Sequence, residues 1–298
     1  MIDVSIVIVN YKVKEYIISS IHSIYEHTKP NIQLEVIVVD NNSNDGSSEL
    51  LKEKFPNATI ICNSYNAGFS KAVNQGVKKC NGNYIFILNP DTLFTHDCLN
   101  VLIEVLKKYK NFGAVGPKLI SEKGSLQESF WETPTILNTL KSVIYLNPSE
   151  SNKNINETFE VKSISGAAIL IPRNIFNELG GLNEDLFWME DVDFSYRMRK
   201  NGYKIYFCPK AEIVHFSGKS AEKNYNISIS NQLMSKIKFF KIHHSKLSFS
   251  VVYLIILFIS LLKTVIFLFF APFSKKFRLK FIAYLYTTYS ILAKLSLR

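Results

Sequence analysis

Residues 5–40 read SIVIVNYKVKEYIISSIHSIYEHTKPNIQLEVIVVD, and this stretch decides the fold. It begins and ends with short apolar runs rich in β-branched residues, at 5–10 and 35–40. Such runs are typical of strands that are buried on both faces of a sheet. The residues between them, 13–27, carry the spacing of a helix. The stretch therefore predicts a strand, a helix and a second strand.

The same alternation continues along the chain. Apolar runs at 58–63 and 84–89 predict two more strands, and residues 47–55 and 70–79 predict helices. Strands that alternate with helices over short connections predict an α/β fold with a doubly wound, mostly parallel, Rossmann-like sheet. Sheets of this kind bind ligands at the carboxyl ends of their strands.

Polar residues follow each of the four predicted strands. They lie at 10–11, 40–47, 63–68 and 89–92. Asn, Asp, Gly and Ser are also ordinary turn formers, and that explanation is sufficient for any single loop. Four enriched loops at one edge of the sheet favour a ligand site.

The remaining chain is less regular. Residues 124–162 lack clear periodicity and predict a long, partly helical excursion, which in compact domains is often a lid or binding loop. Residues 163–172 predict a strand, and 190–200 a helix that ends at Asn-Gly. Two further strands are predicted at 203–209 and 211–216.

Charge is distributed unevenly over the 298 residues. Residues 1–195 hold 17 Lys and Arg against 23 Asp and Glu, whereas residues 196–298 hold 18 against 2. Because the basic excess flanks apolar sequence, it favours an anionic membrane surface as partner and not a nucleic acid. The hydrophobic fraction of 47% excludes a disordered chain.

The cysteines and the N-terminus indicate a cytosolic setting. The four cysteines are scattered without a CxxC pair, which fits reduced thiols. The first residues, MIDVSIVIVNYK, have no basic region and no cleavage site, so they predict a strand and not a signal peptide.

The C-terminal part predicts membrane attachment. Residues 247–271 are mostly apolar and as a helix extend about 38 Å, enough to span a hydrocarbon core with tilt. Lys263 opposes spanning, and basic residues on both sides also fit helices that lie in the interface. Residues 281–297 suit an interfacial helix, and a buried pair of core helices is the alternative. We expect a catalytic domain at 1–225, a basic linker helix at 226–246 and membrane-associating helices at 247–298.

Several side chains have the chemistry of an active site. Asp91 follows a buried strand and can hold a divalent cation, although Pro-Asp is also a common turn. Glu190, Asp191 and Asp193 open a helix, where the helix dipole alone favours acids. Because bulky apolar residues precede them, a carboxylate there can have a raised pKa and act as a general base. His215 stands at the end of an apolar run. In this position it can be a metal ligand, or it can be a purely structural histidine.

The order of several sequence blocks resembles one enzyme family. The blocks are SIVIVNYK, VVDNNSNDGS, NAGFSKAVNQG, LNPDT, SGAAILIPR, FWMEDVDFSYRMRKNGY and VHFSG. Together they resemble the bacterial family 2 glycosyltransferases, especially the rhamnosyltransferase-like branch, over about residues 3–220. The resemblance implies a GT-A fold and an inverting transfer of a sugar from a nucleotide-diphosphate sugar.

The resemblance also implies roles for single residues. Asn89 stands where many relatives carry the first acid of Asp-x-Asp. Asp91 and His215 would hold Mg²⁺ or Mn²⁺. Asp191 would deprotonate the acceptor hydroxyl with Glu190 as its orienting partner, or the reverse. The donor-binding residues implied are Val9, Asn10, Asp40, Asn66, Gly68, Asn89 and Asp91.

The predicted function is thus sugar transfer, with rhamnose favoured, to a glycan or polyprenyl-linked acceptor in cell-surface polysaccharide biosynthesis. The predicted location is the inner membrane, with the catalytic domain on the cytoplasmic side and membrane lipid as a partner. Two alternatives are a nucleotidyltransferase, which usually needs a Gly-rich loop that is missing at residues 10–12, and a non-catalytic membrane-bound scaffold.

Overall fold

A computed structural model describes residues 2–145, 156–216 and 225–295. The chain forms two compact units, each drawn from three segments. The first comprises Met1–Thr133, Asn152–Asp185 and Glu190–Ser220, and the second comprises Pro134–Ser151, Leu186–Met189 and Ala221–Arg298. The second unit therefore takes in chain from the middle of the sequence, whereas the predicted domains follow one another along the chain.

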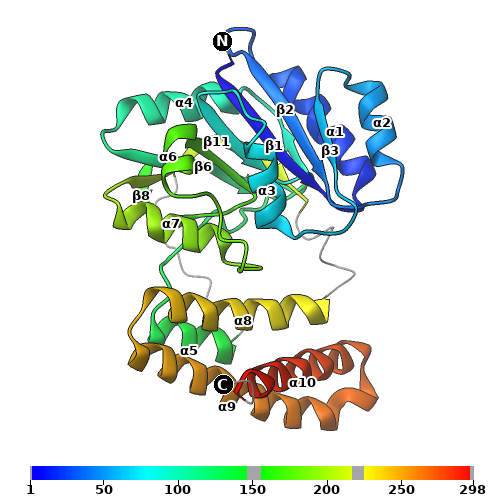
Figure 1. Cartoon of the computed structure of the whole chain (residues 1–298), viewed down its shortest axis with the longest axis vertical. Coiled ribbons are helices and arrows are strands. Elements are labelled where there is room, and N and C mark those ends of the chain that lie inside the picture. The colour runs from blue at the N-terminus through cyan, green and yellow to red at the C-terminus, as the bar shows by residue number, and fades with distance from the viewer. Residues whose placement is uncertain (1, 146–155, 217–224, 296–298) are drawn as a thin grey trace. The chain divides into compact units, whose positions relative to one another are not determined.

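A mixed sheet forms the centre of the first unit (Figure 1). The nine strands in its described part are β1 (Val4–Asn10), β2 (Leu34–Asp40), β3 (Thr59–Cys62), β4 (Tyr84–Leu88), β5 (Thr92–Phe94), β6 (Phe112–Ile120), β8 (Phe159–Val161), β10 (Ala168–Pro172) and β11 (Lys204–His215). Eight follow the order β3-β2-β1-β4-β10-β6-β11-β5, and β8 pairs with β11. The pairs β1–β2, β1–β4, β2–β3 and β6–β11 are parallel, and the remaining pairs are antiparallel. The predicted mostly parallel α/β fold is confirmed.

Helices cover both faces of this sheet. They are α1 (Lys14–His27), α2 (Ser47–Lys54), α3 (Phe69–Val77), α4 (Cys98–Lys108), α6 (Arg173–Glu178) and α7 (Glu190–Lys200). Successive side chains of a strand point to opposite faces, so Ile6 and Ile8 join a core with α1 and α4, while Val7 and Val9 join a core with α3 and α7. Burial on both faces is the reason why the strands lack polar alternation.

Three details differ from the sequence prediction. The predicted strands 203–209 and 211–216 form the single strand β11, with a register shift between Cys208 and Glu212. The predicted strand 163–172 is divided into β9 (Ser163–Ile164) and β10, because the chain turns at Ser165–Ala168 through a backbone hydrogen bond of 3.3 Å. The excursion at 124–162 contains β7 (Phe130–Trp131), which pairs with β9, together with β8 and a helix; its residues 146–155 lie outside the described part.

Helices make up the second unit in its described part. They are α5 (Ile136–Tyr145), α8 (Tyr225–His243), α9 (Lys246–Phe270), the short 3₁₀ turn η2 (Ala271–Phe273) and α10 (Lys275–Leu295). One helical stretch in the described chain, Lys246–Phe273, is long and apolar enough to cross a membrane. Large apolar side chains on it, such as Leu254, Phe258 and Phe269, are exposed.

Candidate active site

The predicted site residues are placed by strand register at one edge of the sheet. Asn10 is paired with Asp40 at the carboxyl ends of β1 and β2. On the other side of β1, Leu88 near the end of β4 pairs with Ile8 and, in the antiparallel direction, with Ala168 at the start of β10. The loops after β1, β2 and β4 and the loop before β10 therefore leave the sheet at the same edge.

Asn10 and Asp40 form a buried polar cluster. The Asn10 amide donates to Asp40 Oδ1 at 2.7 Å and to Ser47 Oγ at 2.7 Å. The Ser43 backbone N–H donates to Asp40 Oδ2 at 3.0 Å, and the Ser43 hydroxyl donates to Oδ1. Asn10 Oδ1 is buried and has no hydrogen-bond partner within the described chain. The cluster fixes the Asp40 carboxylate, and its serines were not singled out from the sequence.

A second polar group organises the loop after β3. Asn41 donates to the Gly68 carbonyl at 3.2 Å and accepts from Asn63 at 2.9 Å. Asn66 Oδ1 accepts from the Gly68 N–H at 3.0 Å. Gly68 has φ +86°, a conformation that glycine adopts without strain. Asn66 and Gly68 thus shape one loop beside Asp40. The Val9 side chain lies in the core, so only the main chain of Val9 is available to a bound ligand.

Asp91 and His215 come together from distant parts of the chain. Antiparallel pairing of β5 with β11 sets His215 opposite Thr92, and the Phe216 N–H donates to the Asp91 carbonyl at 2.9 Å. This places His215 Nε2 3.5 Å from Asp91 Oδ1 and 3.4 Å from Asn89 Nδ2. Both Asp91 and His215 are largely buried.

Gln127 holds the other side of the histidine ring. Its side-chain amide N–H donates to the His215 carbonyl at 2.7 Å, so its Oε1 faces His215 Nδ1 at 3.0 Å. An amide oxygen only accepts, so the arrangement requires a proton on Nδ1. In the neutral ring, Nε2 then presents its lone pair toward Asp91. Gln127 was missed because it lies in the aperiodic excursion, 88 residues from its partner.

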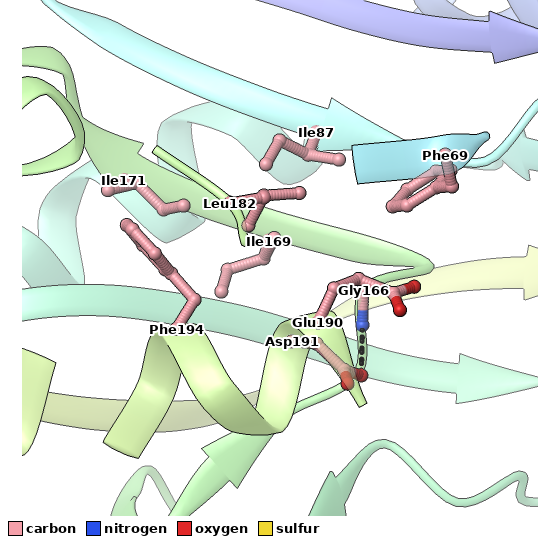
Figure 2. Close-up of a pocket in the computed structure, with 9 residues that line it drawn as sticks. All are labelled: Phe69, Ile87, Gly166, Ile169, Ile171, Leu182, Glu190, Asp191 and Phe194. Atoms are coloured by element: carbon pink, nitrogen blue, oxygen red, sulfur yellow. Dashed lines mark hydrogen bonds between the residues drawn. The ribbon is translucent and has the colours of Figure 1, made fainter. Parts of the chain in front are cut away.

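Asp191 lies at the start of α7 and is held by backbone donors. The Gly166 N–H donates to Asp191 Oδ2 at 2.9 Å, and the Val192 N–H donates to Oδ1 at 2.8 Å. Figure 2 shows Asp191 turned toward Gly166, with Glu190 beside it, among the residues that line a small pocket. Apart from Gly166 and these two acids, the pocket is lined by apolar residues: Phe69, Ile87, Ile169, Ile171, Leu182 and Phe194. Burial raises the pKa of Asp191, although the hydrogen bonds from Gly166 and Val192 act in the opposite direction.

The third acid of the motif has different contacts. Asp193 is fully buried and accepts from Arg197 Nε at 2.8 Å. Arg197 also donates to the carbonyls of Leu179 and Gly181, at 2.6 and 2.7 Å. Asp193 therefore anchors α7 to the preceding loop.

The turn at residues 165–168 links the two halves of the site. The Ala167 carbonyl accepts from the Asn89 N–H at 2.8 Å, while the neighbouring Gly166 N–H binds Asp191. Asp91 and His215 do not line the pocket that Asp191 lines. The structure thus brings Asp91 to His215, and it connects Asp191 to the Asn89 loop through this turn.

The donor set at Asp91 suits a divalent cation only in part. Carboxylate and imidazole groups are accepted ligands of first-row divalent metals, and carboxylates suit Mg²⁺ and Mn²⁺. No group of three or more His, Cys, Asp or Glu side chains that could hold a metal occurs in the described part of the chain. Asp91 and His215 could supply two ligands to a divalent cation, and its other ligands would have to come from elsewhere.

Sequence comparison finds two named relatives of this chain. A rhamnosyltransferase of Mycobacterium tuberculosis (strain ATCC 25618 / H37Rv), named N-acetylglucosaminyl-diphospho-decaprenol L-rhamnosyltransferase, is 24% identical over 220 residues, or 64% of this chain and 69% of that protein. The low-salt glycan biosynthesis hexosyltransferase Agl10 of Haloferax volcanii is 29% identical over 219 residues, covering 72% of this chain and 67% of that one.

A solved structure shares the fold. The mannosyltransferase PcManGT of Pyrobaculum calidifontis, in complex with GDP-Man and Mn²⁺, superposes with a TM-score of 0.57 at 18% identity. The similarity covers 96% of this chain and 86% of that one, and it supports the GT-A fold alone.

The family itself follows from a direct match. The family model described as glycosyl transferase family 2 matches residues 5–180, which is more than half of the chain. The family predicted from the sequence blocks is confirmed. This chain belongs to glycosyl transferase family 2.

Proposed function

We propose that this glycosyltransferase moves a sugar, with inversion, from a nucleotide-diphosphate sugar to a lipid-linked or glycan acceptor during glycan biosynthesis. The observation that carries the proposal is the meeting of Asp91 and His215 at 3.5 Å, on the sheet edge where the 165–168 turn also positions Asp191. A single-displacement transfer needs a site for the leaving diphosphate and a general base for the acceptor, and both are proposed at this edge of the sheet.

The nucleotide of the sugar donor is assigned to two places: the polar cluster around Asp40 and the loop that contains Asn66 and Gly68. Asp40, held by Asn10 and the serines, accepts from a base or ribose donor. The Asn66–Gly68 loop contacts the sugar-nucleotide beside it. Asn89, Asp91 and the main chain of Val9 complete the donor site in this proposal.

Asp91 and His215 are the proposed ligands of Mg²⁺ or Mn²⁺. When bound, the cation neutralises charge on the leaving diphosphate. Gln127 is a positioning residue here, because it fixes the ring nitrogen that faces Asp91. The imidazole can bind a cation at Nε2 only if that nitrogen is unprotonated.

Asp191 is the proposed general base. Its raised pKa favours acceptance of the acceptor hydroxyl proton, and the hydrogen bonds from Gly166 and Val192 hold it in place. The acceptor oxygen then attacks the sugar's anomeric carbon from the face opposite the diphosphate, so one displacement inverts that centre. Glu190 lines the same pocket as Asp191 and is its proposed orienting partner.

The acceptor and location are proposed from the named relatives and the apolar helix. The mycobacterial relative's name specifies L-rhamnose and a diphospho-decaprenol acceptor. We infer dTDP-L-rhamnose as the first donor to test, and attachment to the cytoplasmic side of the inner membrane through the Lys246–Phe273 stretch.

A panel assay tests the function. Purified full-length protein is incubated with nucleotide sugars, lipid-linked acceptors and Mg²⁺ or Mn²⁺, and released nucleoside diphosphate and glycosylated product are measured. We expect both products together, and their loss with chelator. Release of pyrophosphate from a nucleoside triphosphate would indicate a nucleotidyltransferase instead, and no turnover with any donor would support the scaffold alternative.

A further inference from the structure

An apolar groove lies between α5 and α9 in the second unit. It has a volume of about 380 Å³, within the range of small-ligand sites. Seven apolar side chains and one lysine line it: Leu140, Ile144, Ile255, Phe258, Ile259, Leu262, Ile266 and Lys263. A groove of this composition can hold a hydrocarbon chain, and the lysine is the one charged group among its described lining residues.

Lys263 has capacity left for an anion. Its Nζ donates to the Val143 carbonyl at 2.6 Å and to the Tyr284 hydroxyl at 3.3 Å, and it lies over the Tyr284 ring. An ammonium group has three donors, so these two neutral acceptors leave one N–H. In the described part of the chain, no carboxylate lies within salt-bridge distance of Lys263.

A second lysine contacts the same helix. Lys236, from α8, donates to Ser142 Oγ at 2.7 Å, and Ser142 directly precedes the residue that Lys263 contacts. Burial lowers the pKa of Lys236 to about 8. The described residues of the second unit include no Asp or Glu at all. Lys236 and Lys263 thus contact consecutive residues of α5, Ser142 and Val143, and the described part of the unit offers neither lysine a carboxylate partner.

A purely structural explanation covers part of this arrangement. The Val143 carbonyl is among the last four of α5, which have no partner within the helix, and a cation there is favoured by the helix dipole. Such a cap explains one hydrogen bond. It does not explain the apolar groove beside the same ammonium group.

We propose that the groove binds the hydrocarbon chain of a single-chain lipid phosphate and that Lys263 binds its phosphate. One apolar groove beside Lys263 matches one hydrocarbon chain and one anionic head group, whereas a two-chain phospholipid brings a second chain. The inference rests on the proposed function insofar as such a lipid is the acceptor's carrier. The binding itself does not require turnover.

Titration calorimetry with the full chain in neutral detergent tests the proposal. The probes are farnesyl phosphate, farnesol, inorganic phosphate and dioctanoyl phosphatidylglycerol. We expect farnesyl phosphate to bind at least about tenfold more tightly than farnesol, because it adds a charge-assisted hydrogen bond. Inorganic phosphate alone is expected to bind more weakly than farnesyl phosphate.

Three variants identify the site. Lys263→Gln is expected to reduce farnesyl phosphate affinity to that of farnesol, and Leu262→Trp, which fills the groove, to weaken both ligands. The matched control is Lys276→Gln, at an exposed lysine of α10. It is expected to leave the affinities for farnesyl phosphate and farnesol unchanged. A folded Lys263→Gln protein with unchanged farnesyl phosphate affinity would overturn the proposal. If its Tm is also lower, Lys263 serves only as a helix cap.

Two further outcomes separate the lipid classes and the two proposals. Phosphatidylglycerol binding that equals farnesyl phosphate binding and is equally sensitive to Lys263→Gln would overturn the assignment to a single-chain lipid. Lysine-dependent farnesyl phosphate binding in a protein that turns over no nucleotide sugar supports the groove assignment and refutes the proposed function alone.

Discussion

Asp191 and Asp193, which are separated by one residue in α7, are expected to respond differently to the same substitution. Asp191→Asn and Asp193→Asn each remove one negative charge with almost no change in shape. Asp191 accepts from backbone N–H groups beside a pocket, whereas Asp193 is buried against Arg197. We therefore expect the first change to remove activity and the second to remove stability.

The cost of Asp193→Asn follows from the contacts of Arg197. Removing one partner of a buried ion pair costs about 3–5 kcal/mol. The Arg197 side chain is 23% exposed and keeps the carbonyls of Leu179 and Gly181 as acceptors, so the lower end, about 3 kcal/mol, is expected. At about 2–4 °C per kcal/mol, this lowers Tm by roughly 6–12 °C.

Asp191→Asn acts on turnover. Loss of a general base lowers kcat by about 10²–10⁴-fold. The folded pKa of Asp191 is raised, so its contribution to stability is fully present below the unfolded pKa and is lost as pH rises through the folded pKa. At neutral pH the Asp191→Asn variant loses this charge penalty, but its amide nitrogen cannot accept from the second backbone N–H, so its Tm is expected to fall less than that of Asp193→Asn.

The measurements are nucleoside diphosphate release at saturating donor and thermal melting at pH 7.5, on the same preparations. Donor affinity by calorimetry shows whether the Asp191→Asn variant still binds. The reasoning is refuted if the Asp191→Asn variant keeps wild-type kcat, or if the Asp193→Asn variant melts with the wild type while losing turnover.

Three further outcomes are expected. The acidic limb of kcat/KM lies above the ordinary aspartate pKa of about 3.9, because the raised pKa of Asp191 keeps the base protonated to higher pH; a limb at or below that value argues against it. Gln127→Met removes the acceptor that holds the proton on His215 Nδ1, so long-range ¹⁵N NMR is expected to show the tautomer with its proton on Nε2. An unchanged His215 spectrum contradicts the positioning role. Asp91→Ala weakens Mn²⁺ binding in the presence of nucleoside diphosphate by at least about tenfold in calorimetry, and unchanged affinity eliminates Asp91 as a ligand.

The fold was predictable because its signal is local. Each central strand is buried on both faces, so it appears in the sequence as a short apolar run that ends in polar residues. The parallel register then places Asn10, Asp40 and Asn89 at one edge without any knowledge of tertiary contacts. The family resemblance, confirmed by the family match, added the roles expected of these positions.

Contacts between distant segments were not predictable in the same way. Gln127 and His215 are 88 residues apart, and they meet only because β11 runs beside β6, whose chain leads into the Gln127 segment. No periodic pattern marks a residue whose partner is chosen by sheet order. The turn at 165–168 is similar, since the apolar run 163–172 shows a strand but not the break that presents Gly166 to Asp191.

Asp191 and Asp193 show where helix geometry adds to a motif. The dipole favours both equally, so charge alone does not separate Asp191 from Asp193. Residues two apart on a helix differ by about 200° in direction, so the two carboxylates must face different surroundings. Asp193 has Arg197 four residues later, on the same helical face, and that spacing is readable in the sequence as an ion pair. Asp191 has no basic residue at that spacing, since position 195 is serine, so helix spacing favours Asp191 over Asp193 as the acid available for chemistry.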